Sequence, residues 1–205
     1  MIAVKLETPE SIRKLQRGLY LKAKKEPTFR FYLLQDKVWR GDILQHAYHR
    51  VRSNGGAPGI DGVTFQSIDE GEGETVFLSK LQQELKQKSY RPQPVRRVYI
   101  PKADGKQRPL GIPTLRDRVA QMAMKMVIEP IFEADFEGCS YGFRPKKDAH
   151  QAVGAVRTAL NEAHPYVFDA DIQKYFDTIP HNLLLKRVAD RVSDRHIFSW
   201  ITMWL

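Results

Sequence analysis

The sequence contains one cysteine, Cys139, among its 205 residues. A single cysteine excludes an internal disulfide and a zinc site made of cysteines, and it is typical of a reducing compartment. No apolar run approaches the roughly 20 residues that a membrane-spanning helix needs. The amino terminus, MIAVKLETPE, lacks the basic stretch and apolar segment of a secretory signal. These absences favour a cytoplasmic protein with no membrane partner.

The chain also lacks the ending that would turn its glycine-rich segment into a phosphate-binding loop. Residues 53–62 read SNGGAPGIDG, and no Gly-Lys-Ser/Thr follows, so an ATPase of the P-loop type is excluded. Two interpretations stay open: the glycines let the backbone approach a polynucleotide closely, or they form a tight turn. His46 and His49 have no further residues at metal-ligand spacing, so we interpret them as surface or RNA-facing side chains.

Positive charge, in contrast, is abundant and concentrated. The 33 Lys and Arg residues exceed the 24 Asp and Glu residues by nine. Only Asp104 and Asp117 oppose the ten basic side chains of residues 86–118, which are Lys86, Lys88, Arg91, Arg96, Arg97, Lys102, Lys106, Arg108, Arg116 and Arg118. Tyr90, Tyr99 and several prolines interrupt these charges. The pattern favours a surface for nucleic acid or nucleotides over a merely solvated hairpin.

Hydrophobic spacing predicts a largely helical chain with one hairpin. Helices are expected from residue 10, around residues 31–38 and 43–51, over 76–88, after Thr114 with a kink or end at Pro130, over 149–160 and after Pro180. The strands are expected at 95–101 and 107–112, joined by an Asp-Gly turn. Residues 69–75, DEGEGET, predict a mobile polar loop, and Met122 and Met126 predict core packing.

Residues 165–181 carry the pattern with the clearest chemistry, PYVFDADIQKYFDTIPH. A strand ending at Asp171 would place Asp169 and Asp171 on one face, because side chains alternate along a strand. Carboxylates grouped in this way are typical ligands of Mg²⁺, which prefers oxygen donors. The structural alternative is a helix cap or a salt bridge at a strand-to-helix turn.

Three segments in this order resemble the reverse transcriptase domain of bacterial group II intron proteins, which are reverse transcriptases and maturases. They are IPKADGKQRPLGIPTLRDRVAQ, YGFRP and FDADIQKYFDTIPH, and the upstream stretch EPTFRFYLLQDKVWRGDILQHAYHRVRSNGGAPGIDGV resembles the same family. The resemblance implies an α+β fold: the fingers and partial palm of a right-hand polymerase. This part would be mostly helical, with a fingers hairpin and the first palm strand.

The resemblance also implies a division of the chain. Residues 1–62 would form an N-terminal extension and first fingers block, 63–163 the fingers, and 164–205 the start of the palm. The sequence holds no aromatic-Ala-Asp-Asp and no Pro-Gln-Gly motif, and it stops within an apolar pattern. We therefore expect the chain to be cut within a larger fold, by cloning or in a degenerate gene, without a thumb, maturase domain or endonuclease.

Several site residues follow from the resemblance. Asp171 is expected to be catalytic and to bind both Mg²⁺ ions of a complete enzyme, with the backbone carbonyl of Ile172 as a further ligand. Phe176 is expected to pack under the sugar of the incoming nucleotide and to exclude a 2′-hydroxyl. Lys102 and Arg108 are expected to bind the triphosphate, with Lys106 and Arg116 as alternatives that spacing leaves open. RNA contacts are expected at four arginines: Arg96, Arg97, Arg116 and Arg144.

The function implied is an RNA-directed DNA polymerase of a group II intron that also assists intron splicing. Its partners would be template and intron RNA, a DNA primer and deoxynucleoside triphosphates, in a bacterial cytoplasm. Two alternatives stay open: a non-enzymatic module that binds intron RNA, and a fragment of a retron-type or CRISPR-associated reverse transcriptase. Because a two-metal site needs several carboxylates, these 205 residues alone are expected to bind RNA without synthesising DNA.

Overall fold

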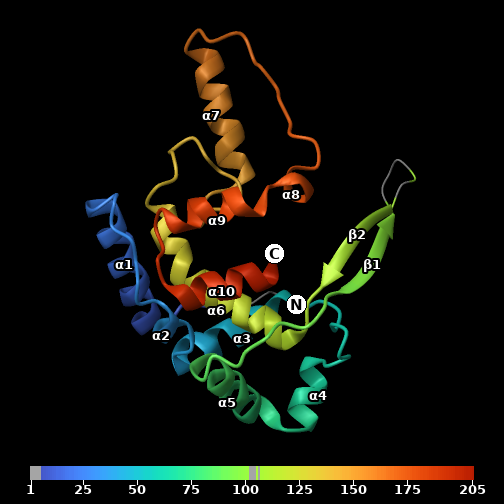
Figure 1. Cartoon of the computed structure of the whole chain (residues 1–205). Coiled ribbons are helices and arrows are strands. Elements are labelled where there is room, and N and C mark those ends of the chain that lie inside the picture. Colours follow the sequence, from blue (N-terminus) through green and yellow to red (C-terminus); the bar gives the residue numbers. More distant parts are fainter. Residues whose placement is uncertain (1–5, 102–104, 106) are drawn as a thin grey trace.

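The computed structural model describes residues 6–101, 105 and 107–205. Within them the chain is mainly helical and carries one hairpin (Figure 1). The strands are β1 (Arg96–Pro101) and β2 (Gln107–Ile112). The helices are α1 (Glu10–Lys25), α2 (Gln35–Val38), α3 (Gly41–Asn54), α4 (Phe65–Glu70), α5 (Gly73–Lys86), α6 (Leu115–Glu133), α7 (Ala149–Asn161), α8 (Tyr175–Thr178), α9 (His181–Ala189) and α10 (Arg195–Trp204).

Helix α6 lies at the centre of the hydrophobic core and packs against α1, α2 and α3. It begins as predicted, because the Thr114 hydroxyl accepts a hydrogen bond from the Asp117 amide at 3.1 Å. Met126 is 2% exposed, which confirms its predicted place in the core, whereas Met122 is only partly buried and packs against the edge of the core. A helix buried on most of its sides is suited to organise the others around it.

Pro130 neither ends α6 nor lies near solvent, since the helix continues to Glu133 and the proline is buried. A proline within a helix leaves the carbonyl four residues earlier without its usual donor. Here that carbonyl belongs to Met126, and it accepts a hydrogen bond from the Gln16 side chain of α1 at 3.0 Å. The contact between α1 and α6 thus compensates for the missing amide.

The predicted hairpin is present and projects from the helical body (Figure 1). Its antiparallel register pairs Arg96 with Ile112, Arg97 with Gly111 and Ile100 with Arg108. Both strands are exposed along nearly their whole length. The two strands therefore pair with each other without packing a face on the core.

The helix expected over residues 31–38 is shorter than predicted, because α2 begins only at Gln35. Phe31 instead pairs with Val192 in an isolated parallel bridge. The carboxylate of Asp194 accepts hydrogen bonds from the amides of Leu34 and Gln35 at 2.8 and 2.9 Å. A distant residue therefore sets the start of α2, which local periodicity does not reveal.

The predicted mobile loop at residues 69–75 is also wrong. Helix α4 extends to Glu70 and α5 starts at Gly73, so only two residues separate them. Thr64 and Ser67 form a reciprocal capping box that starts α4. Ile68 and Phe77 are buried on either side of the short connection and anchor both helices to the core.

The predicted first palm strand is not formed, which corrects the expected fold in one element. Residues 164–172 have no regular secondary structure and are exposed. A strand needs a neighbour that accepts and donates its backbone hydrogen bonds. Within the described residues the only sheet pairs β1 with β2, so this segment has no such neighbour.

The carboxyl-terminal helices return to the core. Helix α9 starts after Pro180 as predicted, and Asp194 caps α10 by accepting from the amides of His196 and Ile197. Ile197 and Trp200 of α10 are buried. No helix in the described parts of the chain combines the length and hydrophobicity required to cross a membrane.

Candidate nucleotide and nucleic-acid site

The acidic segment forms an exposed turn that leads into α8. Asp169 and Asp171 are solvent-exposed, and Lys174 takes a left-handed conformation with φ at 52° as the N-cap of α8. The Lys174 carbonyl accepts hydrogen bonds from the amides of Asp177 and Thr178. No group of three or more His, Cys, Asp or Glu side chains suited to a metal occurs among the described residues. The turn thus offers carboxylate oxygens to solvent.

Phe176 lies in α8, directly after this turn, and is 73% exposed. Tyr175 meets it edge-to-face, with the ring centroids 5.3 Å apart. Tyr175 also lines a hollow of about 360 Å³ together with Ile172, Pro180 and Leu184, whereas Phe176 is not among its lining residues. Tyr175 therefore contacts both the hollow and the Phe176 ring, and Phe176 itself is mostly exposed.

The hairpin divides the predicted nucleotide-binding and RNA-binding arginines between its two faces. Directly paired residues share a face, and neighbours along a strand alternate. Arg108, paired with Ile100, therefore lies on the same face as Arg96, whereas Arg97 lies on the opposite face. Lys102 and Lys106 lie outside the described residues, so their expected roles stay predictions.

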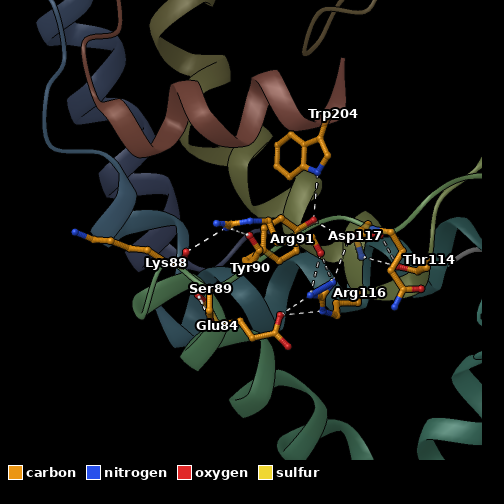
Figure 2. A network of polar contacts seen from close by, with 10 residues as sticks. Glu84, Lys88, Ser89, Tyr90, Arg91, Thr114, Arg116, Asp117 and Trp204 are labelled. Carbon is orange, nitrogen blue, oxygen red and sulfur yellow. Dashed lines mark hydrogen bonds and ion pairs between the residues drawn. The ribbon is translucent and has the colours of Figure 1, made fainter.

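A buried network joins the base of the hairpin to α6 (Figure 2). The Asp117 carboxylate is 1% exposed and accepts hydrogen bonds from the Tyr90 hydroxyl at 2.7 Å, the Thr114 hydroxyl at 2.7 Å and the Gln93 amide at 3.0 Å. Trp204 of α10 donates to the Tyr90 hydroxyl at 3.2 Å. Burial, aided by Asp117, raises the pKa of Tyr90 well above its usual range. This network fixes where β1 and β2 leave the core.

Arg116 belongs to the same network (Figure 2). Its guanidinium donates to Glu84 at 2.5 Å and to the Arg91 carbonyl at 3.1 Å, and it stacks 4.8 Å from the centroid of Tyr90. Arg144 is similarly engaged, with Glu133 at 2.7 Å. Both arginines thus have structural partners. That either binds RNA stays a prediction.

Two further sequence interpretations concern buried residues. His46 is 4% exposed, so its interpretation as a surface side chain is wrong, and burial lowers its pKa. In the glycine-rich segment, whose two interpretations stay open, a β-carbon at Gly59 would lie 2.6 Å from the Thr114 Cα. The glycine is needed for close packing against the start of α6.

The role of Asp117 is not evident from the sequence, where this residue counts only as a charge that opposes the basic stretch. The spacing of Thr114 and Asp117 is that of a helix cap and its third residue, and it is visible in the sequence. The distant partners Tyr90 and Trp204 carry no such signal.

The sequence of this chain is similar to that of known proteins. Residues 100–205 match the family described as reverse transcriptase (RNA-dependent DNA polymerase). The chain is 40% identical to protein YkfC of Escherichia coli K12 over 200 residues, which cover 94% of this chain and 52% of that protein. It is 36% identical over 176 residues to the group II intron-encoded protein LtrA of Lactococcus lactis subsp. cremoris, covering 85% of this chain and 29% of the relative.

A yeast intron protein is also similar to this chain. The putative COX1/OXI3 intron 1 protein of Saccharomyces cerevisiae is 32% identical over 154 residues, covering 75% of this chain and 18% of that protein. The chain thus spans about half the length of the Escherichia coli relative and less than a third of the two intron proteins. With more than half of its residues matched to the family and the predicted fingers hairpin in place, the chain belongs to the reverse transcriptase family.

Proposed function

We propose that this chain supplies the fingers and the Asp171 turn of a group II intron reverse transcriptase that also assists the splicing of its intron RNA. The exposed Asp171 turn, within the segment matched to the family, is the observation that carries the proposal. The intron proteins among the relatives support the intron assignment. We assign residues 1–62 to an extension and first fingers block, 63–163 to the fingers and 164–205 to the start of the palm, in a bacterial cytoplasm.

The reaction proposed is nucleotidyl transfer. The 3′-hydroxyl oxygen of a DNA primer forms a bond to the α-phosphorus of a deoxynucleoside triphosphate, the hydroxyl proton is lost, and pyrophosphate leaves. Mg²⁺ would supply charge neutralisation in this reaction. Asp171 and the Ile172 carbonyl would hold it, since both offer the hard oxygen donors that Mg²⁺ requires.

Arg108 and Phe176 would select and position the nucleotide. Arg108 is exposed on the hairpin, where its guanidinium can donate two parallel hydrogen bonds to phosphate oxygens. We propose Lys102 as its partner on the triphosphate. The exposed ring of Phe176 would occupy the space that a ribonucleotide needs for its 2′-hydroxyl.

A chimera tests the proposal. Residues 1–205 replace the matching segment of the Lactococcus relative, and extension of a DNA primer on an RNA template is measured with Mg²⁺ and deoxynucleotides. We expect extension by the chimera and its loss in Asp171→Asn, with RNA binding kept. Extension that survives Asp171→Asn would contradict the assigned site, and equal loss of binding and extension would indicate a folding role.

A second candidate is a non-enzymatic module that binds intron RNA. The unformed palm strand favours it for this chain by itself, because residues 164–172 have no sheet to hold Asp171. The chimera separates the two, because primer extension that depends on Asp171 is expected from the first candidate and excluded by the second.

A further inference from the structure

A second hollow lies between α3 and α6, away from the Asp171 turn. Its volume is about 250 Å³, and it is lined by Val51, Asn54, Gly55, Arg118, Gln121, Met122 and Lys125. Two cations and two side-chain amides surround it, and no acidic residue is among its lining. The apolar Val51 and Met122 complete the wall. This composition is suited to an anion attached to a less polar group.

The charge of Arg118 is only partly compensated. Its guanidinium donates to the carbonyls of Pro113 at 3.1 Å, Gly55 at 3.4 Å and Ala57. Carbonyl oxygens satisfy its N–H groups but carry no formal charge. Partial burial lowers the pKa of Arg118, and only the more distant Asp61 opposes this effect. Arg116 and Arg144, in contrast, each contact a glutamate directly.

The hollow is held in shape by the glycine-rich segment. Gly55 and Gly56 have φ values of 64° and 109°, and the chain turns here so that the carbonyls of Gly55 and Ala57 accept from Arg118 of α6. A β-carbon at Gly56 would lie 3.1 Å from the Arg118 Nη1 atom. The guanidinium therefore fits closely against this loop and stays fixed at the edge of the hollow.

Of the remaining polar residues, Asn54 ends α3, and Gln121 and Lys125 belong to α6. Gln121 and Lys125 follow Arg118 by three and seven residues, which places all three on one helix face. Lys125 pairs with Glu129 at 3.3 Å, and its side chain is 57% exposed. An exposed pair of this kind is weak, so the ammonium can turn toward an anion in the hollow.

We propose that this hollow binds a backbone phosphate of single-stranded RNA, with Arg118 and Lys125 on the phosphate oxygens and the sugar against Met122. The volume is below the roughly 300 Å³ of small-molecule sites, which favours one phosphate and its sugar over a whole free nucleotide. The inference rests on the RNA-binding part of the proposed function, but it uses none of the residues assigned to nucleotidyl transfer.

The test uses the 205-residue chain and a fluorescein-labelled oligouridylate, with affinity measured by anisotropy between 50 and 200 mM salt. Lys125→Gln should remove one phosphate contact, which flattens the slope of log affinity against log salt by about 0.7. Between 50 and 200 mM salt, the factor by which the affinity of the wild-type chain falls should be about 2.6 times the factor for the variant. The matched control is Lys14→Gln, since Lys14 of α1 also pairs with an acid four residues away and is exposed.

A second readout is the Arg118 Nε–Hε signal in a ¹⁵N spectrum of the same chain. It should shift when RNA is added, and polyglutamate should not reproduce the shift. Equal slopes for Lys125→Gln and Lys14→Gln would overturn the proposal, as would an unchanged Arg118 signal. A shift with polyglutamate would assign the hollow to acidic protein segments instead. None of these outcomes depends on DNA synthesis, so failure of the polymerase assignment is detected separately by the chimera.

Discussion

At the scale of single residues, side chains of the same type have different tasks. Arg108 is exposed on the hairpin, Arg116 bonds to Glu84 beneath it, and Arg118 holds a glycine-rich loop by its carbonyls. Their spacing in the sequence suggests one basic surface. The structure separates them, because Arg116 and Arg118 contact different neighbours near the start of α6, whereas Arg108 is exposed on β2.

Phe176→Ala is predicted to admit ribonucleotides in the chimeric polymerase. Removing the exposed ring opens the space of a 2′-hydroxyl without changing Asp171. Competition between ribo- and deoxynucleotides during primer extension measures the change. Tyr175→Phe serves as a control, because it keeps the ring that contacts Phe176. An unchanged ratio of ribonucleotide to deoxynucleotide incorporation would mean that Phe176 does not exclude the 2′-hydroxyl.

His46 predicts a pH dependence of folding stability. Burial lowers its pKa in the folded chain below the value of about 6.5 expected when unfolded. The unfolded chain then binds more protons as the pH falls below 6.5, so stability is complete above that pH and declines toward the folded pKa. Urea unfolding at pH 7.5 and 5.5 should show this decline, and His46→Leu should reduce it. The half-exposed His49, changed to Gln, should weaken it only slightly, because burial is the largest cause of the lowered His46 pKa and the charge of His49 a smaller one.

Asp117→Ala is predicted to destabilise the chain by about 3 kcal/mol, because several buried donors would lose their acceptor together. Tyr90→Phe removes only one hydroxyl from the network and should cost about 1 kcal/mol. Chemical unfolding of the two variants gives both values. If both variants lost the same small amount of stability, water would be replacing the Asp117 carboxylate as the hydrogen-bond acceptor.

At the scale of elements, connections between distant segments determine where helices begin. Asp194 caps both α2 and α10, so the chain near residue 34 and the chain near residue 195 meet at one carboxylate. Arg191 adds to this junction by donating to the Ala23 carbonyl at 2.8 Å. The start of α2 is thus a tertiary feature.

Two glycine-to-alanine substitutions, one in the glycine-rich segment and one in α7, are predicted to have opposite effects on the stability of the chain. Gly59→Ala should destabilise the chain by about 2 kcal/mol, because its β-carbon would collide with the Thr114 backbone. Gly154→Ala in α7 meets nothing within 4 Å and should instead stabilise by about 0.5 to 1 kcal/mol. Thermal unfolding distinguishes them. A neutral Gly59→Ala would mean that the loop moves freely from α6.

At the scale of the whole molecule, the core and the segment with Asp171 differ in packing. Helices α1, α3, α6 and α10 contribute buried side chains, whereas α7 buries none. Phe168 and Tyr166 are 93% and 95% exposed. The segment proposed to hold Mg²⁺ is thus exposed and lies outside the packed core.

We therefore predict that the 205-residue chain binds RNA but shows no DNA synthesis on an RNA template with Mg²⁺ and deoxynucleotides. The sequence supplies no aromatic-Ala-Asp-Asp motif, and the Asp171 segment pairs with no strand among the described residues. Primer extension by the purified chain is the measurement. Robust extension that Asp171→Ala abolishes would refute the prediction.

The sequence by itself determined the family, the hairpin and most helices. These features depend on local chemistry: hydrophobic periodicity, an Asp-Gly turn, a Thr cap at Thr114 and a motif of contiguous residues. Such signals act between residues close in the chain. They are readable without knowledge of what packs nearby.

Only the tertiary structure decided the rest. It buried His46, set the start of α2 through Asp194 and let Pro130 stay within α6 by a hydrogen bond from Gln16. It also left the apolar segment before Asp171 without a sheet. Burial and backbone pairing depend on neighbours distant in sequence, and hydrophobic residues become a strand only where another strand satisfies their amides and carbonyls.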